Sequence, residues 1–436
     1  ETGKWVSGTF NSSHVMLEHI AALGFDVAYL PPIHPIGFQF RKGPNNTLAA
    51  GPDDPGSPWA IGSHEGGHDA VHPQLGTIEE FDAFVAKANS LGLEVALDFA
   101  LQAAPDHPWV SEHPEWFTTR LDGTIAYAEN PPKKYQDIYP INFDNDRDGI
   151  YQEVLRLINF WVSHGVKIFR VDNPHTKPLN FWDWLMTEVR KDHPEVLFFA
   201  EAFSRPEVMQ TLGKVGFHMS YTYFTWRNTK QELTSYLSEL SAETADFMRP
   251  NFFVNTPDIN PLSTRSGAPA AFAIRTILAT TMSPNWGIYQ GFEQFEFEPL
   301  KPGGEEYINS EKYEYRPRDF NAEPNLNGLI AHLNRIRKEH PALQQLRRCL
   351  ILETTSESIV AFAKNDGEDT VIVVCSLNPH EPVSGEVIVD LTPLGVQAEM
   401  FGVHDELTGG NYVWGPRNFV GLDPANPAHI FTIHAH

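Results

Sequence analysis

The chain has 436 residues, of which 41% are hydrophobic and 20% are charged, as in an ordinary globular protein. This length exceeds one ordinary core and predicts a large domain followed by a smaller one. The formal net charge of −24 argues against nucleic acid as a partner, because nucleic-acid phosphates would be repelled.

The sequence also indicates the compartment of the protein and the redox state of its cysteines. We see no apolar run long enough to cross a bilayer and no signal peptide before the first residues, which predicts a cytoplasmic protein with no membrane partner. Cys349 and Cys375 lie in apolar segments, and we expect both to be reduced core residues. Aromatic residues make up 12% of the chain, which fits either a large core or a carbohydrate site.

Helical and strand patterns alternate along most of the chain. The predicted helices are 13–23 (behind a serine cap), 79–91, 149–164, 181–192, 206–212, 230–245 and 327–339. The predicted strands are 26–30, 93–99, 166–172, 196–201, 251–255 and 286–290.

Repeated strand–helix units imply parallel strands with helical crossovers, and the length favours an α/β fold of the (β/α)₈ TIM-barrel type. We predict this barrel for residues 1–344, with long loops over its mouth at about 37–76 and 103–145. We expect the first strand of the barrel to be missing or poorly formed, because segment 4–8 is short and polar. Seven barrel strands would then remain, six of which have the patterns given above. Strand patterns separated by turn residues predict a C-terminal all-β sandwich for residues 345–436.

Acidic residues follow several of the predicted strands, at the edge of the barrel where active sites are built. Arg170 lies two residues before Asp172 on one strand, so both side chains point the same way, and the cation favours an ionised carboxylate. Apolar neighbours of Glu201 favour its protonated form, which a general acid needs. Taken singly, Arg170 and Asp172 could be a structural ion pair, and Glu201 could be the cap of a helix. Asp258 could be a turn residue.

Together, the order and spacing of these acids resemble the α-amylase superfamily of retaining glycoside hydrolases and transglycosylases. The resemblance implies that Asp172 is the nucleophile, Glu201 the general acid/base and Asp258 the transition-state stabiliser. It places Asp98 in a position that is usually structural.

The sequence departs from the ordinary amylase pattern at two places. Gln102 stands where amylases carry Asn-His, and Pro257 precedes Asp258 in place of His, so the amylase calcium and sugar contacts are not carried over. The spacing of His64, His68 and His72 could suggest a metal, but histidines in Gly-rich mouth loops often serve as hydrogen-bond donors. We therefore expect no metal and no cofactor.

Longer motifs resemble one subgroup, the maltosyltransferase GlgE family. They include Pro32-Ile-His-Pro-Ile-Gly, Glu129-Asn-Pro-Pro-Lys-Lys-Tyr-Gln-Asp-Ile-Tyr-Pro and Arg170-Val-Asp-Asn-Pro-His-Thr-Lys-Pro. The resemblance implies transfer of maltosyl units from α-maltose 1-phosphate to the non-reducing end of α-1,4-glucans, with release of phosphate. Members of that family are homodimers that dimerise through a further N-terminal β-sandwich, which we expect to be missing from this chain.

The same resemblance assigns binding residues. The amide of Asn130, the ammonium of Lys133 and the phenol of Tyr135 lie within six residues on one mouth loop, and such donors suit a phosphate leaving group. The same segment could instead be a turn that prolines make rigid, with lysines on its surface. The residues implied to bind substrate are Asn130, Lys133, Tyr135 and Asn173 for the phosphate, and Lys42, Gln102, Asp137, Arg170, Lys312 and Tyr313 for the maltosyl unit and its site.

Two other functions remain open. A hydrolase or a trehalose-forming isomerase could use the same barrel and the same acids. A non-catalytic glucan-binding protein is a different class, and the presence of the complete acid set argues against it.

Overall fold

The computed structural model describes residues 7–131, 133–397 and 399–434 and divides the chain into two compact units. The first unit is Glu1–His218 with Asn309–Pro317, and the second is Met219–Ile308 with Arg318–His436. Segment 4–8, where the first barrel strand was expected to be missing or poorly formed, begins outside the described residues.

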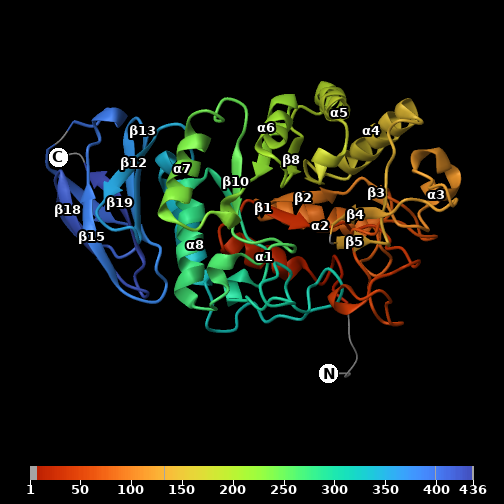
Figure 1. The fold of residues 1–436 in the computed structure, drawn as a ribbon, viewed down its shortest axis with the longest axis horizontal. Helices are drawn as coiled ribbons and strands as arrows, with labels where there is room; N and C mark the ends of the chain where they lie inside the picture. The colour runs from red at the N-terminus through yellow and green to blue at the C-terminus, as the bar shows by residue number, and fades with distance from the viewer. Residues whose placement is uncertain (1–6, 132, 398, 435–436) are drawn as a thin grey trace. The chain divides into compact units, whose positions relative to one another are not determined.

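Parallel strands form the centre of the first unit, where β1 pairs with β2, β2 with β7 and β7 with β8. A helix connects each strand to the next, as the alternating pattern predicted. The strands are β1 (Val27–Leu30), β2 (Glu94–Phe99), β7 (Ile168–Asp172) and β8 (Leu197–Glu201). The helices are α1 (His14–Ala22), α2 (Ile78–Ser90), α4 (Arg147–Ser163), α5 (Leu179–Asp192) and α6 (Pro206–Val215), of which α4 to α6 lie side by side on one flank of the strands (Figure 1).

Local sequence explains where these helices begin. Thr77 and Glu80 form a reciprocal capping box at the start of α2, and Asp146 accepts the Gly149 N–H at the start of α4. Ser13 occupies the predicted cap position of α1, but its side chain makes no capping hydrogen bond.

The predicted mouth loops contain short elements of their own. Strand β3 (Gln102–Ala103) pairs with β6 (Tyr139–Pro140), and β4 (Ala128–Asn130) forms a hairpin with β5 (Lys133–Tyr135). Helix α3 (Pro108–Glu112) lies between β3 and β4. These loops are therefore ordered by hydrogen bonds rather than by a long regular element.

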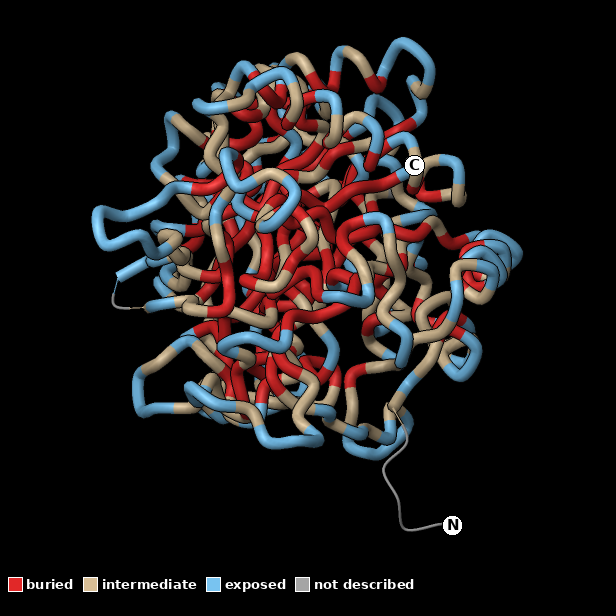
Figure 2. The backbone as a smooth tube through the Cα atoms, turned by 90° about the vertical axis from the view of Figure 1, so that its right-hand side faces the viewer, coloured by how far each residue is buried: buried red, intermediate tan, exposed pale blue. Residues whose placement is uncertain are grey.

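Large aromatic side chains fill the core of the first unit. Phe81, Trp161, Phe169, Trp182 and Phe198 are among its fully buried residues. They lie on the strands and on the inner faces of the helices, so the buried backbone runs through the interior while the exposed segments are mostly loops and outer helix faces (Figure 2).

The second unit begins with parallel strands and their helices. Strand β10 pairs with β9 and with β11. The strands are β9 (Met219–Tyr221), β10 (Pro250–Phe253) and β11 (Asn285–Gly287), and the helices are α7 (Lys230–Ser241), α8 (Pro269–Met282) and α9 (Asn327–Glu339).

Helix α8 was not predicted, although it has 14 residues. Nearly every residue from Ala270 to Met282 is buried, so the helix has no polar stripe and no helical alternation to detect.

The C-terminal part of the second unit is all-β, as predicted. Strand β12 (Cys349–Thr354) pairs with β13 (Ile359–Asp366) through its first half and with β15 (Val383–Ile388) through its last residues, and thereby joins two layers. The remaining strands are β14 (Asp369–Ser376), β16 (Phe401–Asp405), β17 (Asn411–Trp414), β18 (Arg417–Leu422) and β19 (Ala428–His434). Residues from both layers share one hydrophobic core.

Strands β13 and β14 are buried almost throughout, because they also pack on elements of the preceding part of this unit. The Lys364 ammonium donates to the Met282 carbonyl at 2.9 Å, at the C-terminal end of α8.

Both cysteines are free thiols, as expected, but only Cys375 is buried in the core, whereas Cys349 is half-buried. Among the described residues, no helix is long and apolar enough to pass through a membrane.

Truncation of Leu157 on α4 tests the core of the first unit. We expect Leu157→Ala to lower the free energy of unfolding by about 2–5 kcal/mol, because the side chain is almost fully buried. Asn159→Ala, at an exposed position of the same helix, should change it by less than about 0.5 kcal/mol. Denaturant unfolding of both variants measures the difference, and equal midpoints would contradict the assignment of this helix face.

Candidate active site

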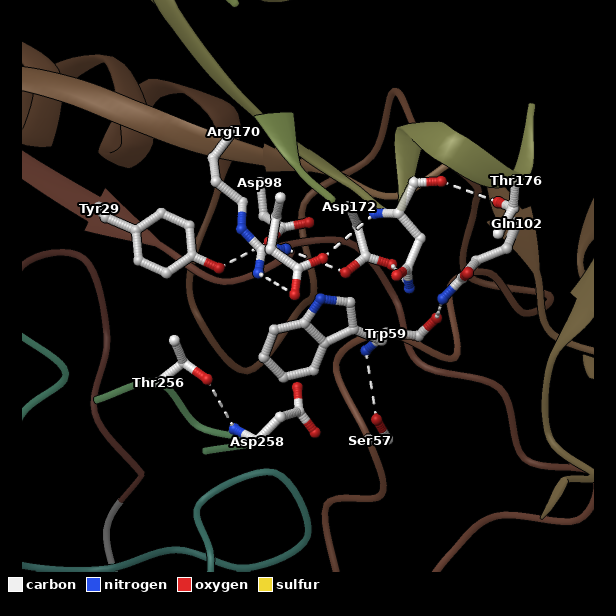
Figure 3. A network of polar contacts seen from close by, with 12 residues as sticks. Tyr29, Ser57, Trp59, Asp98, Gln102, Arg170, Asp172, Thr176, Thr256 and Asp258 are labelled. Atoms are coloured by element: carbon white, nitrogen blue, oxygen red, sulfur yellow. Dashed lines mark hydrogen bonds and ion pairs between the residues drawn. The ribbon is translucent and has the colours of Figure 1, made fainter. Parts of the chain in front are cut away.

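A buried guanidinium connects the predicted catalytic acids. Arg170 Nη1 lies 2.8 Å from Asp98 Oδ2 and 2.9 Å from Asp172 Oδ1, and Arg170 Nη2 lies 3.6 Å from Glu201 Oε1 (Figure 3). All four side chains are buried. The predicted pairing of Arg170 with Asp172 on one side of the strand is therefore present, and it extends to two further carboxylates.

Strand register places these groups. Asp98 on β2 is opposite Arg170 on β7, and Asp172 at the end of β7 is opposite Glu201 at the end of β8. Neighbouring strands lie about 4.8 Å apart. This spacing suits the separation of about 5–5.5 Å between the carboxyl groups of a retaining glycosidase.

Asp98 differs from the other acids because it lies deepest. The Tyr29 hydroxyl donates to Asp98 Oδ2 at 2.6 Å, and the Asp98 side chain has no exposed surface. Burial raises the pKa of Asp98 to about 7, although the neighbouring Arg170 acts in the opposite direction. Asp98 holds the Arg170 guanidinium in place through this contact, which agrees with the structural position that the resemblance implies for Asp98.

Asn173 contacts both catalytic candidates. Its backbone has φ +44°, a left-handed conformation that is uncommon outside glycine. In this conformation the Asn173 N–H donates to Glu201 Oε2 at 3.3 Å, and its side-chain amide donates to Asp172 Oδ2 at 3.3 Å. The local strain is thus used to direct two donors at the two carboxylates.

Lys177 is a cation that sequence reasoning quoted within a motif without giving it a role. Its ammonium lies 3.5 Å from the Asp172 carbonyl oxygen and 3.4 Å from that of Asn173. Burial lowers the pKa of Lys177, while the charges of Asp172, Glu201 and Asp98 oppose that shift. The position of Lys177, five residues after Asp172, is the feature of the sequence that could have identified it as a site residue.

Gln102 and Trp59 form a second part of the site. The Gln102 amide nitrogen donates to the Trp59 carbonyl at 2.9 Å. The Trp59 ring faces the Arg170 ion-pair group (Figure 3) and packs with Ile61, Ala100 and Ile138. Trp59 was not assigned a role from the sequence.

Lys42, Asp137, Lys312 and Tyr313 come from separate segments. Lys42 and Asp137 are both buried, and burial is the main cause that lowers the pKa of Lys42 and raises that of Asp137. Asp137 interacts with the charges of both Lys42 and Lys312. The Lys312 ammonium lies 5.7 Å from the ring centres of Trp59 and Tyr313, which brings this group beside Gln102.

The β4–β5 hairpin carries the predicted phosphate ligands. Asn130 and Lys133 are opposite each other in its register, so an amide and an ammonium share one end of the hairpin. Tyr135 packs against the cluster that contains Trp59. The hairpin is therefore connected to the acid group through Trp59.

Asp258 lies in the second unit, in the turn that follows β10. It is half-buried, and its N–H donates to the Thr256 hydroxyl at 3.2 Å. Asn255 is fixed just before it by the Tyr289 N–H at 2.9 Å and the Tyr307 hydroxyl at 3.0 Å. The role of Asp258 remains a proposal.

No group of three or more His, Cys, Asp or Glu side chains that could hold a metal ion occurs in the part of the chain that the structure describes. In addition, both ring nitrogens of His68 already have hydrogen-bond partners, one in His107 and the other in the Ala100 carbonyl. The spacing of His64, His68 and His72 therefore does not reflect a shared ligand set.

Sequence comparison finds that the chain is similar to maltosyltransferases over nearly all of its own length. It is 56% identical over 441 residues to the alpha-1,4-glucan:maltose-1-phosphate maltosyltransferase of Mycolicibacterium smegmatis, covering 99% of this chain and 63% of the relative. It is 55% identical over 432 residues to maltosyltransferase 2 of Streptomyces coelicolor, covering 98% of this chain and 65% of that protein. The chain thus spans slightly less than two thirds of these relatives. Residues 351–433 also match the family model described as GLGE, C-terminal.

Structural comparison shows the fold. A maltogenic α-amylase from Thermotoga neapolitana superposes with a TM-score of 0.76 at 19% identity, covering 98% of this chain and 94% of that one. An α-amylase from Lactobacillus plantarum gives a TM-score of 0.77 at 21% identity, covering 97% and 94%. The chain therefore has the α-amylase fold, which confirms the prediction of a (β/α)₈ barrel with a C-terminal all-β part.

The raised pKa of Asp98 predicts a pH dependence of stability. The folded protein holds this proton up to about pH 7, whereas the unfolded chain releases it near the ordinary aspartate pKa of 3.8. Stability contributed by this group is therefore present at low pH and is lost as the pH rises through about 7, by up to about 1.4 kcal/mol per pH unit. Asp98→Asn removes this contribution.

Unfolding free energies of the wild type and Asp98→Asn, measured between about pH 5 and pH 8, test this expectation. The wild type should lose stability relative to the variant as the pH rises. Two parallel curves would show that Asp98 is ionised throughout this range.

Proposed function

We propose that the chain, which is similar over nearly its whole length to maltose-1-phosphate maltosyltransferases, transfers maltosyl units from α-maltose 1-phosphate to the non-reducing end of α-1,4-glucans. The observation that carries this proposal is the Arg170 group with Asp172 and Glu201 on adjacent strand ends. Residues 1–344 would form the catalytic part and residues 345–436 the accessory β part. The cytoplasm suits the free thiols of Cys349 and Cys375.

In the first step, an Asp172 carboxylate oxygen attacks the anomeric carbon of the donor. The bond between that carbon and the phosphate oxygen breaks, and phosphate leaves with the proton of Glu201, which becomes a carboxylate. The product is a β-maltosyl ester of Asp172. Arg170 supports this step because its guanidinium holds the Asp172 carboxyl group in place through a contact of 2.9 Å.

In the second step, Glu201 accepts the proton of an acceptor 4-hydroxyl. That oxygen attacks the anomeric carbon, and the bond to Asp172 breaks. Two inversions restore the α-configuration. Asp258 would bind sugar hydroxyls and strengthen its contacts as positive charge develops on the ring.

Phosphate binding falls to the hairpin and to Asn173. The Lys133 ammonium and the Asn130 amide share one end of the hairpin, and charge-assisted bonds of this kind are strong with phosphate. Tyr135 would add a hydroxyl donor. Lys42, Gln102, Asp137, Lys312 and Tyr313 would bind the maltosyl unit, in the way that the resemblance implies.

Incubation of the protein with α-maltose 1-phosphate and a short maltooligosaccharide tests the activity directly. We expect phosphate release to be matched by products that lengthen two glucose units at a time. Asp172→Asn is the control, and it should release no phosphate because the nucleophile is lost. Free glucose or trehalose without chain extension would favour the hydrolase or the isomerase, and binding without turnover would favour a glucan-binding protein.

Two adjacent lysines separate a phosphate role from general surface charge. Lys133→Ala should lower kcat/KM for maltose 1-phosphate roughly 10- to 150-fold, as expected for the loss of a hydrogen bond to a charged group. Lys134→Ala is the matched control, since Lys134 is exposed and pairs with Glu129 at 3.8 Å. Equal rates for both variants and the wild type would refute the phosphate role of Lys133.

A further inference from the structure

Two buried histidines, His68 and His107, lie outside the group of residues that bind substrate in the proposed function. They come from the two mouth loops, and each is 2% exposed. His107 Nε2 lies 3.0 Å from His68 Nδ1. His68 Nε2 lies 2.8 Å from the carbonyl oxygen of Ala100, the first residue after β2.

The direction of this hydrogen-bond chain is fixed at one end by a backbone donor. The Trp109 N–H donates to His107 Nδ1 at 3.0 Å, so that nitrogen carries no proton. A neutral His107 must then carry its proton on Nε2 and donate to His68 Nδ1. A neutral His68 must in turn donate from Nε2 to Ala100, and every ring nitrogen in the chain has one partner.

An additional proton has no acceptor in this arrangement. A proton on His68 Nδ1 would face the N–H of His107 at 3.0 Å. Burial accordingly lowers the pKa of His68 to about 4 and that of His107 well below its usual value. Both rings are therefore neutral near pH 7, and their hydrogen bonds have a single possible pattern.

The surroundings are shaped to hold the two rings. A Cβ at Gly62 would lie 2.0 Å from His107 Cδ2, and one at Gly67 would lie 2.8 Å from His107 Nε2. The Trp109 ring stacks on His68 with 4.7 Å between ring centres. Glycines from one loop thus make room for a ring from the other.

The chain ends at the backbone that carries Gln102. The Ala100 carbonyl accepts both His68 Nε2–H and, at 3.0 Å, the Gln102 N–H. The Gln102 side chain then donates to the Trp59 carbonyl. A loss of the His68 bond would therefore release the turn that points Gln102 into the site.

We propose that His68 and His107 are a positioning pair that fixes Gln102 for binding of the donor sugar. This inference rests on the proposed function, because Gln102 is taken as a maltosyl ligand. Neither histidine touches substrate, and both act through the Ala100 carbonyl.

Substitutions at position 68 separate positioning from simple packing. His68→Leu fills the space but can neither donate nor accept, and it should raise KM for maltose 1-phosphate about tenfold with a smaller change in kcat. His68→Gln can still donate to Ala100 and should restore most of the loss. In a Gln102→Ala background, His68→Leu should have little further effect on KM, because both changes remove one contact.

A second variant covers the case in which His68→Leu does not fold. His107→Asn keeps an acceptor at the position of Nδ1 for the Trp109 N–H at the start of α3, but its shorter side chain has no atom at the position of Nε2, which is the donor to His68. It should raise KM in the same direction. Unchanged KM in folded His68→Leu or His107→Asn protein overturns the proposal. Additive effects of His68→Leu and Gln102→Ala overturn it as well.

Amide hydrogen exchange of a peptide covering residues 100–104, without any sugar, gives a readout independent of activity. Exchange should be faster in His68→Leu and His107→Asn than in the wild type and in His68→Gln. If the wild type shows this protection but does not turn over maltose 1-phosphate, the proposed function has failed and the turn is still held. If exchange is equal in all variants, the positioning pair has failed.

Discussion

The Arg170 guanidinium contacts the carboxyl groups of Asp98, Asp172 and Glu201 in a region that excludes most water. A buried carboxylate without a partner is unstable, and removal of one member of such a group costs on the order of 3–5 kcal/mol. The group also depends on the register of β2, β7 and β8, since a shift of one residue would point Arg170 to the opposite face. Strand pairing and charge balance therefore support each other, and the geometry of the two catalytic candidates follows from both.

The elements that sequence reasoning found have a clear period or a clear acid at a strand end. Most predicted helices of the first unit lie within two or three residues of the observed ones, because their apolar faces pack on the strands. The elements that it missed lack such signals. Helix α8 is buried all round, and β9 has only three residues, too few for a pattern.

The site was predicted in part for the same reason. The Arg170–Asp172 pair follows from strand geometry alone, and the acid order follows from the chain. Proximity between distant segments does not. Lys42, Asp137 and Lys312 were assigned through the family resemblance, and only the structure shows that their charges interact. His68 was interpreted as a loop hydrogen-bond donor, but its partner His107 lies 39 residues away and belongs to the other loop.

Gly62 and Gly67 give this last contact a consequence for how the protein can vary. A side chain at either position would occupy the space of the His107 ring, and Gly62 has φ +101°, which disfavours other residues independently. The three positions therefore depend on one another sterically, although they belong to two separate loops. A loop exchanged between relatives, or redesigned for another donor, would have to carry its matching partner from the other loop to keep the mouth of the barrel intact.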